Sequence, residues 1–380
     1  MKIKKEVVLS MFLIDKPMQV FENILSQRME NQFISDSKTS SPLQIVRKMG
    51  ALQAQDYEAA LWAIGLRCGG KTTVSDVQLA LENAEIVRTW LFRGTLHIAA
   101  HEDVRWMIEP CSARLNRTAV LRDQKLGLSQ DMVEKTKSVL VDALKGRKIL
   151  TRTEMYEIFE RNGVPSTNNL GYHMLYRASW DGLICFGPQK GKEQTFVLLD
   201  EWVKELRMYP EEDVLKELAV RYFEGHGPAT ISDFAWWTGI KMPEAREGIE
   251  KATRLIAEEV DGKTYYSFRE KSTVKFEDGK TVLLPAFDEY VLGYTDRTQL
   301  ADNGKSKEAK LVHSNGVFLP TILSEGKIIG TWKKQKKGNV MKIYIEPFDL
   351  VHKHLLSDLK EATESYGNFL EMETRMEIWS

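Results

Sequence analysis

The sequence has few cysteines, almost no net charge and no long apolar run. Its three cysteines, Cys68, Cys111 and Cys185, lie far apart, with neither paired spacing nor a histidine cluster beside them. This pattern excludes a disulfide framework and a structural zinc site, and it fits a reducing cytoplasm best. No segment approaches the length of a membrane span. The start of the chain resembles a short signal peptide but lacks a small-residue cleavage site, so we do not expect export.

The formal net charge of -1 provides no overall basic field. Any contact with nucleic acid must therefore come from local patches of positive charge. With 380 residues, of which 43% are hydrophobic, the chain is long and apolar enough for two to four domains with real cores.

Hydrophobic periodicity and turn residues divide the chain into three helix-rich units and a strand-rich tail. The first unit covers residues 20–125, the second 126–205, the third 206–270 and the tail 271–380. In each unit, helices are followed by a hairpin, which is the order that a winged helix requires. The sequences of the units have diverged too far for a strict repeat. We predict an α+β fold of three tandem modules of one design and a small β-rich domain.

Local signals place the elements of the three units. Thr151 followed by Glu154 is typical of a capping box, which opens a helix ending near Asn162. The other helices are expected at residues 42–49, 74–83, 170–181 and 214–223, from Ser232 onward, and at 243–256. The hairpins are expected at residues 87–99, 183–199 and 260–268.

Short alternating stretches dominate the tail. Strands are expected at residues 274–276, 281–284, 317–322, 327–332 and 339–345, followed by a closing helix at 348–361 and a last strand at 369–378. This spacing predicts a small barrel or sandwich.

Two glutamines, Gln53 and Gln55, stand one residue apart among small and apolar neighbours. On a strand or in an extended turn, residues i and i+2 project to the same side, so both carboxamides can reach one bound atom. Such an arrangement suits the holding of a water or a ligand. The same spacing also fits glutamines that end a helix and bond to nearby backbone.

Around this glutamine motif (Gln53-Ala54-Gln55) the sequence resembles the AlkZ/YcaQ family of winged-helix DNA glycosylases, which carry a Gln-x-Gln or Gln-x-Asp catalytic motif near the start of the chain. The resemblance continues through 87–97, then 227–230 with Asp233, Phe234 and Trp237, then 285–297 and 330–332. Landmarks that follow in this order over most of the chain argue against chance similarity.

The resemblance implies three winged helices with a small barrel, in a DNA repair glycosylase. Such an enzyme hydrolyses the N-glycosidic bond of N7- or N3-alkylated purines, including bulky or interstrand cross-linked adducts. Its partner is double-stranded DNA, and the resemblance implies an enzyme with no metal and no cofactor. We expect it to be monofunctional and to act as a monomer, which three modules around one duplex would suit. Because a cationic alkylated purine is already a good leaving group, two neutral amides can suffice. By resemblance, Gln53 or Gln55 orients the attacking water, and the carbonyl dipole of the other stabilises the developing charge.

Two other classes of function fit the same residues. One is a non-catalytic winged-helix DNA-binding protein or regulator, in which the glutamines contact phosphate or base edges. The other is a small-molecule or structural protein that inherited the fold, which would have no salt-dependent affinity for DNA.

Several polar residues near the family landmarks are candidates for auxiliary roles. Asp56 is a rival for the role of general base, although a helix N-cap is the alternative duty. His97 is placed to contact DNA, to orient a water, or to pack in the interior. Asp296 and Arg297 are expected to form a structural ion pair. The tryptophans at helical or strand spacing, Trp90, Trp106, Trp236 and Trp237, are interpreted as core residues.

The strongest local patch of positive charge lies in the tail, where residues 327–342 contain six lysines and no acid. Residues 333–338 are expected at a hairpin tip that grips phosphates, with a solvated turn as the alternative. Further basic residues, Lys145, Arg147 and Lys148, occur in the second unit. The predicted DNA contacts are Arg88, Arg93, Arg152, Arg177, Lys190, Lys192, Lys333, Lys334, Lys336 and Lys337.

Overall fold

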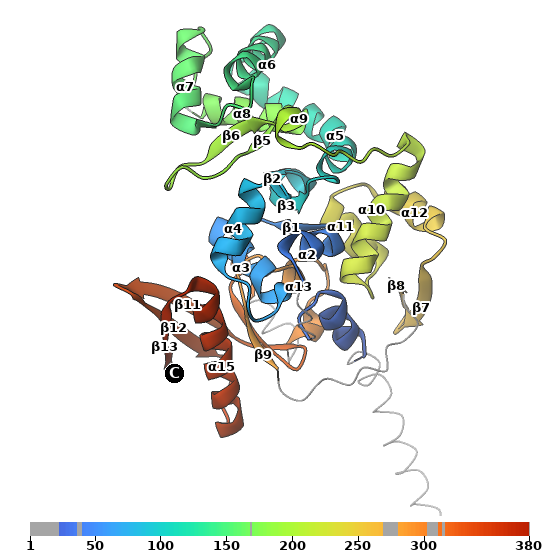
Figure 1. The fold of residues 1–380 in the computed structure, drawn as a ribbon. Coiled ribbons are helices and arrows are strands. Elements are labelled where there is room, and N and C mark those ends of the chain that lie inside the picture. Colours follow the sequence, from blue (N-terminus) through green and yellow to red (C-terminus); the bar gives the residue numbers. More distant parts are fainter. Residues whose placement is uncertain are drawn as a thin grey trace, which may run out of the picture.

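The computed structural model describes residues 23–35, 40–167, 169–268, 280–301, 311–313 and 316–379. Both helices and strands occur throughout these residues, so the predicted α+β class is confirmed. Figure 1 shows the second unit above the first, the third unit beside the first, and the sheet of the tail on the side opposite the third unit.

The first unit surrounds a small sheet with helices. Ser41 caps α2 through a capping box with Gln44, and Pro42 occupies its first turn, so the helix begins where it was predicted. Its short strand β1 pairs with β3, which gives the sheet order β1-β3-β2. The elements are α2 (Pro42–Met49), β1 (Ala51–Gln53), α3 (Tyr57–Cys68), α4 (Val74–Glu82), β2 (Ile86–Trp90), the short η1 (Phe92–Gly94) and β3 (Leu96–Ala100).

The second unit follows a long helix, α5 (Val104–Lys125), and repeats the order of the first. Thr151 and Glu154 form the predicted capping box of α7. The short strand β4 pairs with β6 in the sheet order β4-β6-β5. The elements are α6 (Gln130–Leu144), β4 (Leu150–Thr151), α7 (Arg152–Arg161), α8 (Leu170–Trp180), β5 (Ile184–Phe186), β6 (Thr195–Leu198) and the short α9 (Leu199–Trp202).

The third unit has the same order with a reduced first strand. A single bridge joins Ala229 to Tyr266 on β8, where the other units have a short strand. Helix α11 begins at Ile231, ahead of the expected Ser232, because Thr230 and Asp233 form its capping box. The elements are α10 (Glu211–His226), α11 (Ile231–Thr238), α12 (Met242–Lys251), β7 (Ile256–Val260) and β8 (Lys263–Ser267). The three units therefore share one topology: helix, short strand, two helices, and a hairpin whose second strand pairs with the short strand.

The tail forms a five-stranded sheet in the order β13-β12-β11-β10-β9. No pairing between β9 and β13 closes it within the described residues, so the predicted barrel is not confirmed. The predicted strand at 274–276 lies outside the described residues. The elements are β9 (Thr281–Leu284), α13 (Glu289–Leu292), η2 (Thr298–Leu300), β10 (Thr321–Ser324), β11 (Lys327–Lys337), β12 (Val340–Pro347), α15 (Lys353–Leu370) and β13 (Glu373–Ile378).

Aromatic packing joins the tail to the first unit. Trp62 on α3 contacts the rings of Tyr366 and Phe369 on α15, each at 5.0 Å between ring centroids. A Cβ added at Gly65 would lie 2.2 Å from the Phe369 ring, so this close approach of the two helices requires glycine. The division of the chain at residues 125, 205 and 270 stays a prediction, since these contacts cross the last boundary.

The hydrophobic core is largely continuous through the three units and the inner face of the tail sheet. Trp90, Trp106 and Trp237 are buried in it, as predicted, but Trp236 is 40% exposed, so its interpretation as a core residue was wrong. Nowhere in the described part of the chain is a helix long and apolar enough to cross a membrane.

Candidate active site

The glutamine motif lies where β1 of the first unit passes into α3. Gln53 is the last residue of β1 and is only 9% exposed, whereas Gln55 is exposed in the bend that follows. The Gln55 side-chain oxygen accepts a long hydrogen bond of 3.5 Å from the Leu96 backbone. The two carboxamides thus have different surroundings, and their convergence on one bound atom stays a prediction.

Hydrogen bonds fix the motif backbone on both sides. The backbone N–H of Gln53 donates to Glu289 Oε1 at 2.8 Å, and that of Ala54 donates to the Leu96 carbonyl at 2.7 Å. The carbonyl of Ala54 accepts from Arg88 Nε at 3.2 Å and Nη2 at 2.9 Å. These partners lie up to 236 residues from the motif in sequence. The motif is therefore held rigidly by the tertiary structure, as a catalytic group must be.

Glu289 is a buried carboxylate directly behind Gln53. It is 1% exposed, and its Oε2 accepts from Trp237 Nε1 at 3.0 Å and from His226 Nε2 at 3.2 Å. Burial acts to raise the pKa of Glu289, but the hydrogen bonds from His226 and the Gln53 backbone outweigh it and leave the pKa below its usual value. The carboxylate is therefore ionised at neutral pH. Sequence reasoning gave Glu289 no role, although it lies in the stretch that most resembles the family.

His97 lies beside Gln53 on the sheet, because the two residues are direct partners in the β1 and β3 ladder. Its Nδ1 donates to the Thr95 carbonyl at 2.9 Å, and its Nε2 is buried with no hydrogen-bond partner. Burial, followed by the nearby Arg93 charge, lowers the pKa of His97 to about 4, so the ring is neutral at pH 7. The side chain is fully buried, which excludes the direct contact with DNA that was one of its predicted roles.

Asp56 caps α3. Its carboxylate accepts from the Ala59 backbone N–H at 3.0 Å, which confirms the alternative duty weighed for it. The side chain is exposed but engaged at the helix end, where the helix dipole favours its negative charge.

Three arginines predicted to contact DNA are held by other groups. Arg88 is 4% exposed and bonds the motif backbone, as described above. Arg177 is also 4% exposed and forms an ion pair with Asp123, which accepts from His173 at 2.6 Å as well. Arg93 donates to the backbone carbonyls at the end of α11, including that of Trp237. The three side chains are committed to internal partners rather than projecting from the surface, so their contact with DNA stays a prediction.

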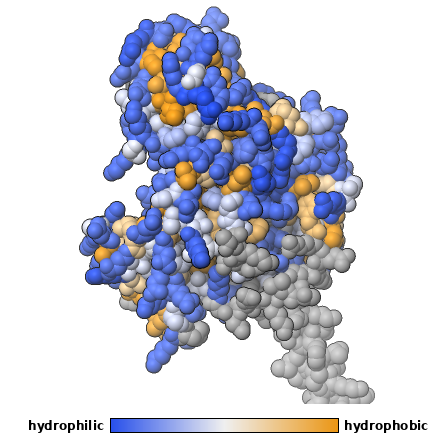
Figure 2. Space-filling model, viewed as in Figure 1, coloured by the Kyte–Doolittle hydropathy of each residue, from blue (hydrophilic) through white to orange (hydrophobic). Residues whose placement is uncertain are grey.

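The predicted cations that are exposed lie on two hairpins and at the start of α7. Lys190 and Lys192 occupy the turn between β5 and β6, and Lys190 lies 3.4 Å from Glu154. Arg152 is exposed at the start of α7. Figure 1 shows the hairpin of β5 and β6 and the hairpin of β11 and β12 projecting on the same side of the molecule, and the outline in Figure 2 is hollowed between them.

The lysines of the tail lie along a strand and not in a turn. β11 continues through Lys337 and pairs with β12, so the tip is formed by residues 338–339 and the predicted hairpin tip was placed too early. Lys333 pairs with Glu346 at 2.6 Å, and Lys334 pairs with Glu58 at 2.7 Å. Lys336 and Lys337 are exposed next to the tip.

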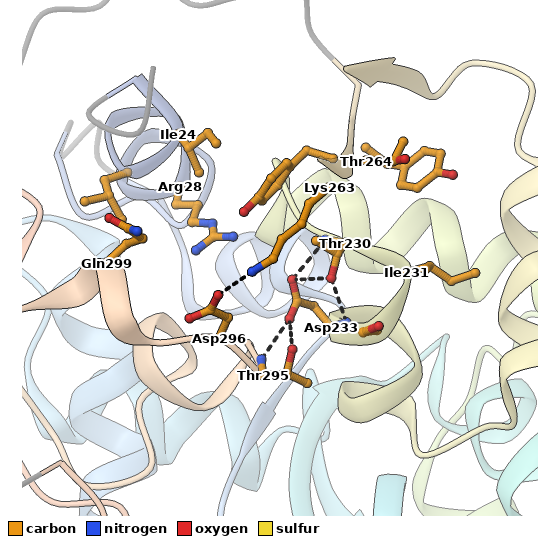
Figure 3. A pocket seen from close by; sticks show the side chains of 14 residues that line it. Ile24, Arg28, Thr230, Ile231, Asp233, Lys263, Thr264, Thr295, Asp296 and Gln299 are labelled. Carbon is orange, nitrogen blue, oxygen red and sulfur yellow. Dashed lines mark hydrogen bonds and ion pairs between the residues drawn. The ribbon is translucent and has the colours of Figure 1, made fainter. Parts of the chain in front are cut away.

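A separate cavity of about 430 Å³ lies between the helix at residues 23–31, α11, β8 and residues 295–299. Figure 3 shows Lys263 paired with Asp296, and Asp233 hydrogen-bonded to Thr230 and Thr295, whereas no line joins Arg28 to another drawn residue. Lys263 pairs with Asp296 at 2.6 Å, and Asp233 accepts from Thr295 at 2.6 and 2.8 Å. The predicted pair of Asp296 with Arg297 was therefore wrong. Although burial acts to raise the pKa of Asp296, the hydrogen bonds from Lys263 and Thr298 lower it to about 2. These contacts join the third unit to the tail beside the cavity.

Within the described residues, no group of three or more His, Cys, Asp or Glu side chains is arranged to hold a metal ion. The three cysteines are free and buried, and burial raises the pKa of Cys68 and Cys111 to about 12. None of the three thiols is activated as a nucleophile.

Both the sequence and the fold of this chain are similar to those of known proteins. The chain is 24% identical over 332 residues to an interstrand DNA cross-link repair glycosylase from Streptomyces sahachiroi, covering 82% of this chain and 87% of the relative. The solved structure of the Streptomyces sahachiroi DNA glycosylase AlkZ has the same fold, with a TM-score of 0.79 at 20% identity over 94% of this chain and 99% of that one. The family model described as DNA glycosylase AlkZ-like matches residues 46–369. A match over this much of the sequence, with the glutamine motif at the junction of β1 and α3, shows that the chain belongs to the AlkZ-like family of DNA glycosylases.

Proposed function

We propose that this protein is a monofunctional DNA repair glycosylase that hydrolyses the N-glycosidic bond of N7- or N3-alkylated purines in duplex DNA. The observation that carries the proposal is the rigid glutamine motif, fixed between Glu289 and Arg88 in a chain of this family. The curated relative is named for interstrand cross-link repair, and we extend the proposed substrates to cross-linked and bulky adducts on that basis.

The proposed chemistry needs little acid or base strength. Loss of an alkylated purine neutralises the positive charge of the base and leaves positive charge on the sugar ring, which water must attack. The Oε1 atom of Gln53 is buried and has no hydrogen-bond partner among the described residues, and we propose that it accepts from that water when the water enters the site. The ionised Glu289 behind it stabilises positive charge on the sugar through its field, and this field is strong because the carboxylate is shielded from solvent.

The proposed DNA path follows the hollowed side of the molecule. We assign the three units of common topology as winged-helix modules and the tail sheet as an open half-barrel. Exposed cations on both hairpins and at the start of α7 are proposed to contact phosphates and thereby to hold the duplex over the glutamine motif. These cations are Arg152, Lys190, Lys192, Lys333, Lys334, Lys336 and Lys337. Lys333 and Lys334 must exchange their carboxylate partners for phosphate, so we expect weaker contributions from them. We propose that the protein acts as a monomer.

A duplex with a single N7-methylguanine tests the proposal. We expect purified wild type to release the base, leaving an alkali-labile site, and Gln53→Ala to release it about 100- to 1000-fold more slowly with DNA affinity retained. Gln130→Ala, at the exposed start of α6, serves as a matched control and should keep the wild-type rate. If wild type binds the duplex but releases no base, and Gln53→Ala loses binding, the protein is the regulator of the alternative hypothesis.

A further inference from the structure

Arg88 is a buried cation without an anionic partner. Its guanidinium bonds the Ala54 carbonyl and lies over two rings, 5.3 Å from the centroid of Tyr57 and 4.9 Å from that of Phe186. Among the described residues no carboxylate pairs with it, and burial lowers the pKa of Arg88 to about 10, so it is still charged at neutral pH. A buried charge that lacks a counterion is costly to the fold unless a ligand supplies one.

The Arg88 side chain lines a cavity of about 150 Å³ between the first unit and the hairpin turn of the second. The walls come from the start of α3, from α4 and from residues 186–194. Gln189 and Gln194 bring neutral amide donors from the turn, and Tyr57 brings a hydroxyl group from α3. Glu82 at the exposed rim is the one acidic residue of the lining. Of the five N–H groups of Arg88, two point at Ala54, which leaves three for a ligand.

We propose that this cavity binds a phosphate group of the DNA backbone, with Arg88 as its central ligand and the amides of the second-unit turn as further donors. A guanidinium surrounded by neutral donors fits a phosphate oxygen better than a base edge, because the anion supplies the missing counterion and can accept two parallel hydrogen bonds. The proposal rests on the proposed function for its ligand.

Arg88 links this site to the glutamine motif. The same guanidinium that receives the phosphate fixes the carbonyl between Gln53 and Gln55. Seating of the phosphate therefore also fixes the motif, so Arg88 is a positioning residue for the reaction as well as a DNA ligand. An enzyme built this way reaches full activity only when the backbone beside the lesion is correctly placed.

The test replaces phosphates near the lesion one at a time by neutral methylphosphonates, and measures dissociation constants and single-turnover rates. With wild type, we expect one linkage at which the loss of charge weakens binding about 10- to 100-fold. With Arg88→Gln, we expect that linkage to have no further effect, the salt slope of log Kd to fall by about 1, and the bound-state rate to fall as well. Arg88→Lys should restore part of the affinity but not the rate, because one ammonium cannot hold both the phosphate and Ala54. Arg161→Gln removes an exposed charge of α7 and should leave the methylphosphonate profile unchanged.

A second variant covers the case in which Arg88→Gln fails to fold. Gln189 is exposed on the turn, so Gln189→Glu should fold normally and weaken binding by placing a negative charge at the cavity. Gln189→Glu and wild type should bind equally well when the duplex carries the methylphosphonate at that same linkage, because the phosphate charge that the glutamate repels is then absent.

The proposal is overturned if no linkage depends on Arg88 or on Gln189. It is also overturned if no methylphosphonate linkage changes the affinity for DNA, but inorganic phosphate raises the melting temperature of wild type and not of Arg88→Gln. The cavity would then bind a free anion and not the DNA backbone. Both results can be obtained from binding alone. Absence of base release by wild type would refute the proposed function without deciding this one.

Discussion

Glu289→Gln provides the sharpest test of how the active site is built. In the wild type, the carboxylate accepts three hydrogen bonds, from Gln53, Trp237 and His226. The amide of the variant keeps one acceptor oxygen for Gln53, but its NH2 group faces the Trp237 N–H, so at least one buried donor loses its partner. The change also removes the buried negative charge.

The expected magnitudes follow from these contacts. Each hydrogen bond to a charged group contributes about 1.5–3 kcal/mol, so we expect the free energy of unfolding to fall by about 3 kcal/mol. A displacement of the motif by about 1 Å costs about 100-fold in rate, and loss of the field of Glu289 acts in the same direction. Because Glu289 is 1% exposed and cannot touch the duplex, the dissociation constant for DNA should not change.

Single-turnover base release at saturating enzyme, with urea unfolding measured in parallel, separates the two effects. Asp123→Asn is the matched control, because Asp123 is also a buried carboxylate bonded to a histidine and another side chain, but it lies on α5 and its partners, His173 and Arg177, belong to the second unit. We expect the control to lose stability and to keep its rate at a temperature where both variants are folded. An equal loss of rate in both variants, or an unchanged rate in Glu289→Gln, would refute a positioning role for Glu289.

Two further predictions concern pH and salt. The pKa of His97 in the folded protein is about 4, below the usual value of about 6.5, so between these pH values the unfolded state binds more protons and stability falls as the pH is lowered. We expect His97 to account for a loss of about 3 kcal/mol in the free energy of unfolding between pH 6.5 and pH 4, measured by urea unfolding. A His97→Gln variant should lack this part of the pH dependence. An identical pH dependence in both proteins would contradict a buried, neutral His97 ring. Lys336→Gln should weaken binding equally for damaged and undamaged duplexes and lower the salt slope of log Kd by about 0.9. Lys360→Gln is the control, because it removes an exposed charge of α15 and should leave the slope unchanged. Equal slopes in the wild type and both variants would mean that the β11 and β12 hairpin does not contact DNA.

Local signals predicted much of the fold. The capping box at Thr151 and the proline at residue 42 set helix starts that depend only on nearby residues, and both predictions are confirmed. The lysine-rich strand shows the limit of such signals. Residues 333–337 are polar at every position, so they lack the alternation that identifies a strand, and only pairing with β12 keeps them extended.

Local sequence signals could not predict the surroundings of the candidate site. A glutamine pair can be found in the sequence, but whether each side chain is buried depends on partners far along the chain. Arg88 was predicted to contact DNA from its charge and its place on the first hairpin, but its side chain packs against Phe186, which the second unit contributes. The role of Glu289 was missed for the same reason, because nothing within its own segment places it next to Gln53.

The surroundings of the glutamine motif are therefore built from three parts of the chain. The tail contributes Glu289, β2 of the first unit contributes Arg88, and the second unit contributes Phe186, which packs on Arg88. Any shift of the second unit relative to the first moves the Arg88 guanidinium and, through two hydrogen bonds, the Ala54 carbonyl. We expect the exposed cations of the second-unit hairpin to bring this hairpin onto the DNA backbone and thereby to act on the same contact. Binding of the duplex and alignment of the glutamines would then be coupled, so a substitution of Phe186, which packs on Arg88 and leaves the motif untouched, should alter the rate of base release as well as the affinity for DNA.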